Sequence, residues 1–365
     1  MEGLEMSKAG ELQGNYSGRS VFVTGHTGFK GSWLALWLAK MGARVTGYAL
    51  APCTSPSLFD VAQVKDVMAR HHLADVRDTA SLTTAMREAA PEIVFHLAAQ
   101  PLVRLSYREP EATWSTNVMG TVNLLEAVRA CPSVKAVVVI TTDKCYENRE
   151  WLWGYRETDP LGGSDPYSAS KAAAELVVQS YRRSFFGNGP LLASARAGNV
   201  IGGGDWSEDR LIPDAARAVA AGKPLLIRNP AATRPWQHVL ESLHGYLLLG
   251  SRLLAGQREF ADAFNFGPDA ADNLPVAEVL TRLQAHWPGL KWQMDPQAGN
   301  APHEAGFLYL DSSKAKRLLN WAPIWNLECG LEQTADWYRS VSQRASVARE
   351  VCERQLERFL GERSQ

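Results

Sequence analysis

The hydrophobic pattern in the first half of the chain alternates between two kinds of segment. Short β-branched or apolar runs predict buried strands at residues 19–24, 43–50, 71–76, 93–98, 134–141 and 191–197. Stretches with apolar residues at helical spacing predict helices at residues 32–41, 79–90, 116–130 and 168–186. Strands that alternate with helices predict an α/β fold with a doubly wound parallel sheet and helices on both faces.

The pattern changes near residue 198. Glycines cluster at residues 202–204, and Pro, Trp and Arg become frequent through residue 240. We therefore expect a first domain at residues 19–198 and a smaller α/β unit at residues 199–365, with some return of the chain to the sheet. Residues 331–360 predict one or two amphipathic helices with a solvated charged face. Residues 1–18 are polar and contain glycine, which predicts a flexible leader.

Composition excludes several classes of partner. The 365 residues carry 38 basic and 39 acidic side chains, a net charge of −1, so no general positive field attracts nucleic acid or an anionic membrane. No uncharged apolar run approaches the roughly 18 residues of a membrane span. The 5 cysteines are scattered without CxxC spacing, which argues against a disulfide scaffold or a metal site and favours a reducing, cytoplasmic location.

A glycine-rich loop follows the first predicted strand and precedes the first predicted helix. Gly25, Gly28 and Gly31 form a GxxGxxG pattern. Glycine permits the tight turn and the close approach of backbone N–H groups to a pyrophosphate, and the helix N-terminus favours its negative charge. The loop therefore predicts a dinucleotide site. His26 and Lys30 inside it either reach phosphate or are solvated loop residues.

This spacing resembles the extended short-chain dehydrogenase/reductase family, whose members modify nucleotide-linked sugars on a Rossmann domain. The segment HLAAQ (96–100) resembles the family's alanine-rich segment beside the nicotinamide, and DVRD (75–78) resembles its acidic segment near the adenine. Asp78 is equally well read as a helix N-cap. The resemblance implies these cofactor-binding residues: Gly25, Thr27, Gly28, Phe29, Lys30, Gly31, Asp75, Val76, Leu97, Ala98, Ala99, Tyr167 and Lys171.

The end of the second strand bears on the choice of cofactor. Residues 48–50 (YAL) lack the acid that usually binds the adenosine ribose 2′-hydroxyl, and residues 51–64 lack an Arg or Lys to hold a 2′-phosphate. The residues by themselves only lean toward NAD over NADP.

Tyr167 and Lys171 stand four residues apart at the start of a predicted helix. Residues at i and i+4 share one helix face, so both side chains reach the same ligand. Bringing a Tyr pKa from about 10 to about 7 takes roughly 4 kcal/mol, to which a nearby ammonium and a cationic nicotinamide both contribute. The resemblance implies that Tyr167 deprotonates a sugar hydroxyl and that Lys171 also binds the nicotinamide ribose.

The strand at residues 134–141 runs into Thr142, Asp143 and Lys144, at the sheet edge where parallel sheets bind ligands. In the 4,6-dehydratase branch of the family this segment usually reads Thr-Asp-Glu. The Lys at 144, with HTGFKGSW (26–33), AAQPLVRLSY (98–107) and RAGNVIGGGDW (196–206), resembles the subfamily of CDP-glucose 4,6-dehydratases over residues 19–337.

That resemblance implies an internal redox dehydration of CDP-glucose to CDP-4-keto-6-deoxyglucose, with bound NAD as the hydride carrier. Thr142 would hydrogen-bond the reacting oxygen, and Asp143 would protonate the departing 6-hydroxyl. Lys144 acts either as a neutral base at C5, which we favour, or as a charged stabiliser of the enolate. The resemblance also implies a role in deoxysugar biosynthesis, such as that of lipopolysaccharide, while the residues do not indicate the final sugar.

Candidate substrate-binding residues occupy the second half of the chain and one earlier position; they are Gln100, Asn199, Trp206, Arg210, Arg234, Trp236 and His303. The resemblance assigns Arg234 to the pyrophosphate. A surface ion pair is the alternative for Arg210, a loop hydrogen bond for His303, and core packing for the tryptophans. Asn117 is expected to be a buried structural amide and Cys145 a packing residue.

Other functions remain open at this point. They are a dehydratase of another nucleotide hexose, a 4-epimerase, and a non-catalytic NAD-sensing protein on the same fold. An epimerase needs no acid at C6, so the pair of Asp143 and Lys144 argues against it. A sensor need not retain Tyr167 and Lys171. The resemblance also implies a symmetric homodimer formed through a helix pair.

Overall fold

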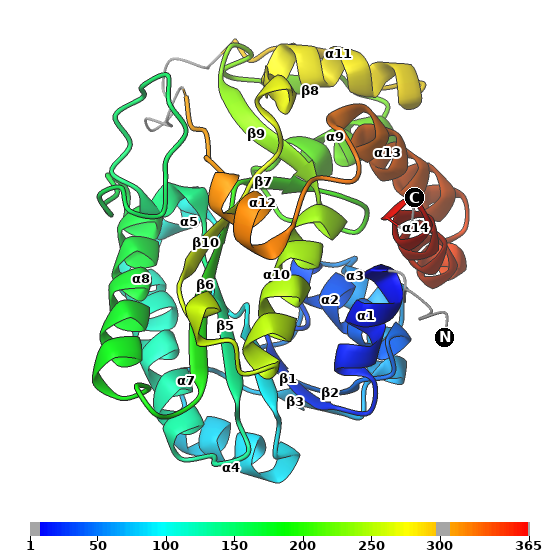
Figure 1. Ribbon diagram of the computed structural model, residues 1–365. Coiled ribbons are helices and arrows are strands. Elements are labelled where there is room, and N and C mark those ends of the chain that lie inside the picture. The colour runs from blue at the N-terminus through cyan, green and yellow to red at the C-terminus, as the bar shows by residue number, and fades with distance from the viewer. Residues whose placement is uncertain (1–7, 297–306, 364–365) are drawn as a thin grey trace, which may run out of the picture.

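The computed structural model describes residues 8–296 and 307–363. Within these residues a central sheet of seven parallel strands has the order β10, β6, β5, β4, β1, β2, β3 (Figure 1). The strands are β1 (Ser20–Thr24), β2 (Arg44–Ala49), β3 (Arg70–Leu73), β4 (Ile93–His96), β5 (Ala136–Ile140), β6 (Leu191–Ala197) and β10 (Ala263–Phe266). The doubly wound parallel sheet expected from the sequence is confirmed.

Helices cover both faces of this sheet (Figure 1). One face carries α1 (Lys8–Tyr16), α2 (Phe29–Lys40) and α10 (Val239–Leu254), and the other carries α4 (Thr79–Ala89), α7 (Gly120–Arg129) and α8 (Pro166–Ser184). Side chains alternate between the faces along each strand, because the β period is two residues. In β1, Val21 and Val23 join one hydrophobic cluster, whereas Phe22 joins the other.

The strand order reverses beside β1, and this reversal locates the crevice for a ligand. From β1 the chain proceeds to β2 and β3 on one side and to β4, β5 and β6 on the other. Loops that leave β1 and β4 therefore diverge at their carboxyl ends, which is where doubly wound sheets bind ligands. The glycine loop and the alanine-rich segment both lie at this point.

The chain beyond residue 198 builds two smaller sheets and also returns to the large one. Strands β7 (Asn199–Ile201), β9 (Thr233–His238) and β11 (Asn273–Pro275) form one small sheet, and β8 (Leu225–Ile227) pairs with β12 (Trp292–Met294). Strand β10 pairs with β6 at the edge of the central sheet. The chain beyond residue 198 therefore contributes strands to the two small sheets and to the central sheet.

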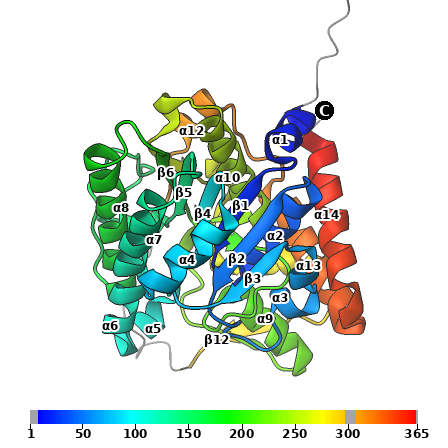
Figure 2. The ribbon, with the colours of Figure 1, turned by 90° about the horizontal axis from the view of Figure 1, so that it is seen from below.

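The remaining helices pack against the small sheets or against α2, α8 or α10. They are α3 (Leu58–Val61), α5 (Val103–Arg108), α6 (Pro110–Trp114), α9 (Leu211–Ala220), α11 (Val276–His286), α12 (Ser313–Leu319), α13 (Leu327–Gln343) and α14 (Ala348–Arg363). Figure 2 shows α14 running past α2 and α3. The charged tail expected at residues 331–360 is therefore two helices, and Phe359 on the second is fully buried.

The expectation of a flexible leader is wrong for the described part of residues 1–18. Residues 8–16 form α1, which packs against α10. Tyr16 is fully buried, and its hydroxyl donates to the Leu247 carbonyl oxygen at 2.8 Å. One buried aromatic side chain anchors a short helix whose own composition is polar, a tertiary contact that the local pattern does not reveal.

No helix in residues 8–296 or 307–363 is both long and apolar enough to cross a membrane.

Candidate active site

The glycine loop between β1 and α2 is shaped by contacts that exclude side chains. Gly25 has a φ of +75°, and a Cβ there would lie 2.7 Å from the Ala98 backbone nitrogen. A Cβ on Gly31 would lie 2.1 Å from the Gly25 carbonyl oxygen. Gly28 caps α2 without any side-chain hydrogen bond. The uncapped helix N-terminus and its bare backbone therefore form a cradle that fits a pyrophosphate.

Other residues of the loop face different surroundings. The Thr27 hydroxyl donates to the Leu50 carbonyl oxygen at 2.8 Å, which ties the loop to the end of β2. Phe29 lies against Gly202, where a Cβ would be 3.2 Å from the ring. Lys30 donates to the Tyr246 hydroxyl at 3.3 Å, and burial lowers the pKa of Lys30 to about 7.

His26 neither faces the phosphate cradle nor is solvated, so both expectations for it are wrong. The side chain is fully buried behind the loop, with Nε2 at 3.0 Å from His71 Nδ1 and its ring edge-on to Phe59. A Cβ on Gly47 would lie 2.4 Å from this ring, so the strand residue beside it must be glycine. Burial lowers the pKa of His26 to about 3. His26 is a neutral packing residue, neither a phosphate ligand nor solvated.

The alanine-rich segment is fixed by hydrogen bonds from neighbouring elements. The Ala98 backbone N–H donates to the Thr24 hydroxyl at 3.2 Å, so Leu97, Ala98 and Ala99 pass directly beside the glycine loop. The Gln100 side chain is hydrogen-bonded within the protein: its amide donates to the Thr113 hydroxyl on α6 at 2.8 Å, and its oxygen accepts from the Leu102 N–H at 2.6 Å. Its predicted contact with substrate stays a prediction.

Asn117 is a buried structural amide, as expected. It lies in a π-helical turn, Ser115–Met119, and bonds both backbone groups of Gln100. Its amide nitrogen also donates to the Ser170 hydroxyl at 2.9 Å. Ser170 precedes Lys171 on α8, so Asn117 holds the alanine-rich segment against α8.

At the adenine end, the two aspartates have different roles. Asp78 accepts from the Ser81 N–H at 3.0 Å and caps α4, which confirms the N-cap interpretation. Asp75 accepts hydrogen bonds from Nε and Nη2 of the Arg77 guanidinium, and these hold the pKa of Asp75 below its usual value. Val76 is buried beneath α7. An adenine contact from Asp75 or Val76 stays a prediction.

Tyr167 and Lys171 share the buried face of α8, whose N-terminus is capped by Asp165. The Tyr167 backbone N–H donates to the Ser106 hydroxyl at 3.1 Å, and Lys171 donates to the Ile140 carbonyl oxygen at 3.3 Å. Burial raises the pKa of Tyr167 to about 12, opposed by a hydrogen bond with Thr142 and the charge of Arg210. Burial lowers the pKa of Lys171 to about 8. The protein groups alone therefore leave Tyr167 protonated at neutral pH.

The turn after β5 places a carboxylate beside these residues. The Thr142 hydroxyl donates to Asp143 Oδ1 at 2.9 Å, and the Lys144 backbone N–H approaches the same hydroxyl at 3.3 Å. Asp143 is 1% exposed, and its Oδ2 has no hydrogen-bond partner within the part of the chain that the structure describes. A buried, unpartnered acceptor is costly, so this atom is available to a ligand hydroxyl. Lys144 is half-buried.

Cys145 ends this turn in a small hydrophobic cluster with Tyr146 and Tyr155. The thiol is fully buried, and burial raises its pKa well above the usual value. Cys145 is therefore a packing residue, as expected.

The polar substrate-side candidates Arg210, Asn199 and Arg234 differ in their surroundings. Arg210 lies close enough to Tyr167 to lower its pKa, and its guanidinium pairs with Asp205 at 2.9 Å. Asn199 begins β7 and is half-buried, whereas Arg234 is buried in β9 and donates to the Thr233 carbonyl oxygen at 2.9 Å. His303 lies outside the described residues.

The two substrate-side tryptophans also differ. Trp206 is half-buried and lies edge-on to Tyr338. Trp236 is 5% exposed within the main hydrophobic cluster, and its indole N–H donates to the Leu274 carbonyl oxygen at 3.1 Å. This placement favours the packing alternative for Trp236 over a wall of the substrate pocket.

Sequence reasoning passed over three polar residues that organise the site. Ser106 and Tyr246 hold Tyr167 and Lys30, and no local pattern marks them because their partners are distant in sequence. Glu175 did leave a signal: it follows Tyr167 and Lys171 at the same spacing of four on α8. In residues 8–296 and 307–363, no group of three or more His, Cys, Asp or Glu side chains is arranged to hold a metal ion.

Comparison with known proteins agrees with this geometry. Residues 22–334 match the family model described as GDP-mannose 4,6 dehydratase. The chain is 52% identical over 332 residues to a CDP-glucose 4,6-dehydratase of Salmonella typhimurium, covering 89% of this chain and 92% of the relative. It is 28% identical to a dTDP-glucose 4,6-dehydratase of Xanthomonas campestris, covering 87% and 92%.

A solved dTDP-glucose 4,6-dehydratase of Streptomyces venezuelae, with NAD bound, superposes with a TM-score of 0.71 at 26% identity, over 88% of this chain and 97% of that one. The family match spans the glycine loop, the turn after β5 and α8. The chain therefore belongs to the GDP-mannose 4,6 dehydratase family, within the extended short-chain dehydrogenases/reductases.

Proposed function

We propose that the protein is a CDP-D-glucose 4,6-dehydratase, a hydro-lyase that forms CDP-4-dehydro-6-deoxy-D-glucose and water. The 52% identity to the Salmonella enzyme supports the substrate. The observation that carries the reaction type is the buried Asp143 in the turn beside Tyr167, whose Oδ2 has no hydrogen-bond partner among the described residues. A base for oxidation and an acid for dehydration in one site are what a 4,6-dehydratase requires.

The cofactor we propose is NAD. The bare cradle at Gly25, Gly28 and Gly31 fits its pyrophosphate, and the relative from Streptomyces venezuelae was solved with NAD. Bound NAD would supply the hydride acceptor for C4 of the sugar and the hydride donor for C6. Lys171 would hold the nicotinamide ribose, while Leu97, Ala98 and Ala99 would supply the backbone wall beside it.

Tyr167 is the base that removes the proton of the 4-hydroxyl. Its side chain is hydrogen-bonded to that of Thr142. Thr142 would hydrogen-bond the same 4-hydroxyl oxygen of the sugar. Because burial raises the pKa of Tyr167 to about 12, the phenolate forms only when further positive charge reaches the site. The charge of Arg210 already opposes the rise, so it is not enough by itself. The cationic nicotinamide would supply the rest, so the base is activated only with cofactor in place.

Asp143 gives its proton to the departing 6-hydroxyl. Burial keeps water from its Oδ2, so the carboxyl exchanges its proton with substrate. Lys144, the adjacent half-buried residue, removes the C5 proton that the 4-keto group acidifies, and gives a proton back to C5 when the hydride is returned to C6. Its other candidate role is to stabilise the enolate as a cation.

The diphosphate and nucleoside are bound by residues from β7, β9 and α9. Arg210 at the start of α9 brings positive charge near Tyr167, and Arg234 and Asn199 lie on adjacent strands of the small sheet. We propose that these three hold the diphosphate and sugar and that Trp206 borders the nucleoside.

The direct test is turnover. The purified protein is incubated with NAD and, in parallel, with CDP-, dTDP-, UDP- and GDP-glucose, and the 4-keto-6-deoxy product is identified by mass spectrometry. Product is expected from CDP-glucose, at a kcat/KM at least tenfold above that of each other nucleotide. Absence of product from CDP-glucose overturns the proposal, and product from another nucleotide alone reassigns the base.

The assembly we propose is a cytoplasmic homodimer. Apolar side chains on adjacent helices of one face are exposed: Trp114 on α6, Met119 before α7 and Leu176 on α8 are 42%, 51% and 56% exposed. A second copy of the chain would cover them. All five cysteines are free thiols, which suits a reducing compartment. Light scattering gives the mass in solution, and a monomer at micromolar concentration would contradict the dimer.

A further inference from the structure

Glu175 is a buried carboxylate that the proposed chemistry does not use. It lies on α8 one turn beyond Lys171, and its side chain is fully buried. Residues at i and i+4 lie on one helix face, so Tyr167, Lys171 and Glu175 follow one another along the face that meets the sheet.

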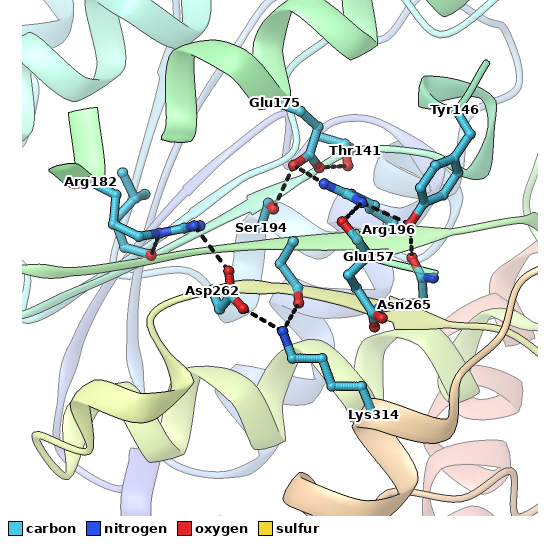
Figure 3. Close-up of polar contacts among 12 residues, drawn as sticks. Thr141, Tyr146, Glu157, Glu175, Arg182, Ser194, Arg196, Asp262, Asn265 and Lys314 are labelled. Carbon is cyan, nitrogen blue, oxygen red and sulfur yellow. Dashed lines mark hydrogen bonds and ion pairs between the residues drawn. The ribbon is translucent and has the colours of Figure 1, made fainter. Parts of the chain in front are cut away.

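The Glu175 carboxylate binds groups from two strands. It accepts from the Thr141 hydroxyl at 2.5 Å and the Ser194 hydroxyl at 2.8 Å. It also pairs with Arg196 at 2.7 Å, with both side chains 0% exposed (Figure 3). Burial acts to raise the pKa of Glu175, but the charge and hydrogen bond of Arg196 and the two hydroxyls hold it below its usual value. Glu175 is therefore ionised.

Glu175 and Lys171 hydrogen-bond to consecutive residues at the end of β5. Lys171 donates to the Ile140 carbonyl oxygen, and Glu175 accepts from Thr141. The next two residues are Thr142 and Asp143. Lys171 and Glu175 therefore fix the position of Asp143 relative to Tyr167, because both side chains come from α8.

Arg196 extends the network to the far edge of the sheet. Its second amino group donates to the Tyr146 hydroxyl at 2.7 Å, and Tyr146 donates to the Asn265 side-chain oxygen at 2.7 Å. Figure 3 shows these groups in a continuous chain from α8 across β6 to β10. Glu175 is held from several sides, so its charge stays in a fixed place beside Lys171.

We propose that Glu175 is a positioning residue of the active site, which ties the catalytic helix to the end of β5 and supplies the negative charge that keeps the Lys171 ammonium protonated. This inference rests on the proposed function for its catalytic meaning, but not for its test.

The charged and titratable groups around Lys171 support this assignment. Burial lowers its pKa to about 8, and Glu175 is the largest opposing influence, ahead of Cys145 in the turn after β5. The other groups near enough to interact are His96 on β4, whose pKa burial lowers to about 3, and Lys30 on α2. A neutral imidazole and a second amine cannot replace a carboxylate as a source of negative charge.

The test measures the protonation of Lys171 directly. Protein without cofactor is labelled competitively with acetic anhydride over a range of pH, and the acetylated fraction of the peptide that carries Lys171 is followed by mass spectrometry. In the unmodified protein the amine should become reactive near pH 8. In Glu175→Gln the midpoint should fall by about one pH unit or more, because the opposing charge is gone.

Glu175→Gln removes the carboxylate that is ion-paired with the buried Arg196 cation, which destabilises the fold. The double variant Glu175→Gln/Arg196→Met removes both charges and keeps the test usable. Its unfolding temperature should recover part of the decrease seen in Glu175→Gln. The pH midpoint of Lys171 acetylation should stay low. A midpoint unchanged from the unmodified protein in the folded double variant overturns the proposal.

Glu241→Gln is the matched control: the same substitution at a second buried glutamate, which is held by the backbone N–H groups of Ile324 and Trp325. It should leave the Lys171 midpoint in place, and an equal fall there would point to general loosening and overturn the proposal. In turnover assays the alkaline limb of kcat in the double variant should move to lower pH in parallel. Failure of turnover in the unmodified protein would overturn the proposed function. The pH midpoint of Lys171 acetylation would still test the role of Glu175.

Discussion

The Gly31 Cα lies so close to the Gly25 carbonyl oxygen that a Cβ on Gly31 would stand 2.1 Å from it. Glycine is required here by contact with backbone, and backbone cannot turn aside as a flexible side chain can. The approach brings the first turn of α2 directly beneath the loop after β1, and so fixes where the uncapped helix N-terminus points.

Gly31→Ala should therefore cost about 3 kcal/mol of folding free energy, because the loop and helix must separate. NAD affinity should fall more than stability predicts, since the cradle itself opens. Thermal unfolding and calorimetric titration with NAD measure the two effects. Gly14→Ala, in α1 where nothing lies within 4 Å of the added Cβ, is the control and should be neutral or slightly stabilising. Equal unfolding temperatures for the two variants would contradict this view of the loop.

Removal of the Tyr167 hydroxyl should reduce kcat by about 10²- to 10⁴-fold with little change in KM, because the base acts on the reacting hydroxyl alone. The measurement is steady-state turnover of CDP-glucose by Tyr167→Phe. Tyr181→Phe provides the comparison: the residue lies on the same helix, but its hydroxyl donates to Glu126 away from the site. A Tyr167→Phe enzyme within tenfold of the unmodified rate would exclude Tyr167 as the base.

Lys144→Met separates the two roles of Lys144. A base at C5 is needed for any exchange of the C5 proton, so the variant incubated with CDP-glucose in D₂O should show neither exchange nor product. Lys135→Met, at an exposed lysine paired with Glu92 before β5, should exchange normally. Persistent C5 exchange without product would assign Lys144 to stabilisation of the enolate instead. NMR of the recovered sugar distinguishes these results.

The buried Glu241 should make stability depend on pH. Burial raises its pKa from 4.5 to about 8, opposed by hydrogen bonds from the Trp325 and Ile324 backbone N–H groups. The unfolded chain releases this proton near pH 4.5 and the folded chain holds it to about pH 8. The contribution to stability is therefore full below pH 4.5 and is lost as pH rises to about 8, with a slope that approaches 1.4 kcal/mol per pH unit at most, to order of magnitude.

Glu241→Gln should remove that slope, so its advantage over the unmodified protein in thermal unfolding should grow between pH 5 and pH 8.5. Glu126→Gln serves as the reference, because hydrogen bonds from Tyr181 and Arg129 hold the pKa of Glu126 below its usual value and its titration lies outside this range. A constant difference across the range would mean that Glu241 is already ionised in the folded protein.

Local patterns were sufficient for the elements that form the candidate site. β1, the glycine loop and α2 follow from a β-branched run, three spaced glycines and an apolar helical period, all within 22 residues of Ser20. Tyr167 and Lys171 follow from a spacing of four on one helix, because helical geometry alone puts them on one face. For such features the sequence determined both the element and the direction of its side chains.

Contacts between distant segments decided the rest. Whether His26 meets phosphate or packs behind the loop depends on the space left by Gly47 and on His71, 45 residues away. The burial that raises the pKa of Tyr167 comes from the packing of the whole domain, and the carboxylate beside Lys171 is fixed in place by Arg196 from β6. The sequence by itself determined which reactive groups the protein carries. Only the tertiary structure decided their charge, because desolvation and pairing depend on neighbours that the local pattern does not contain.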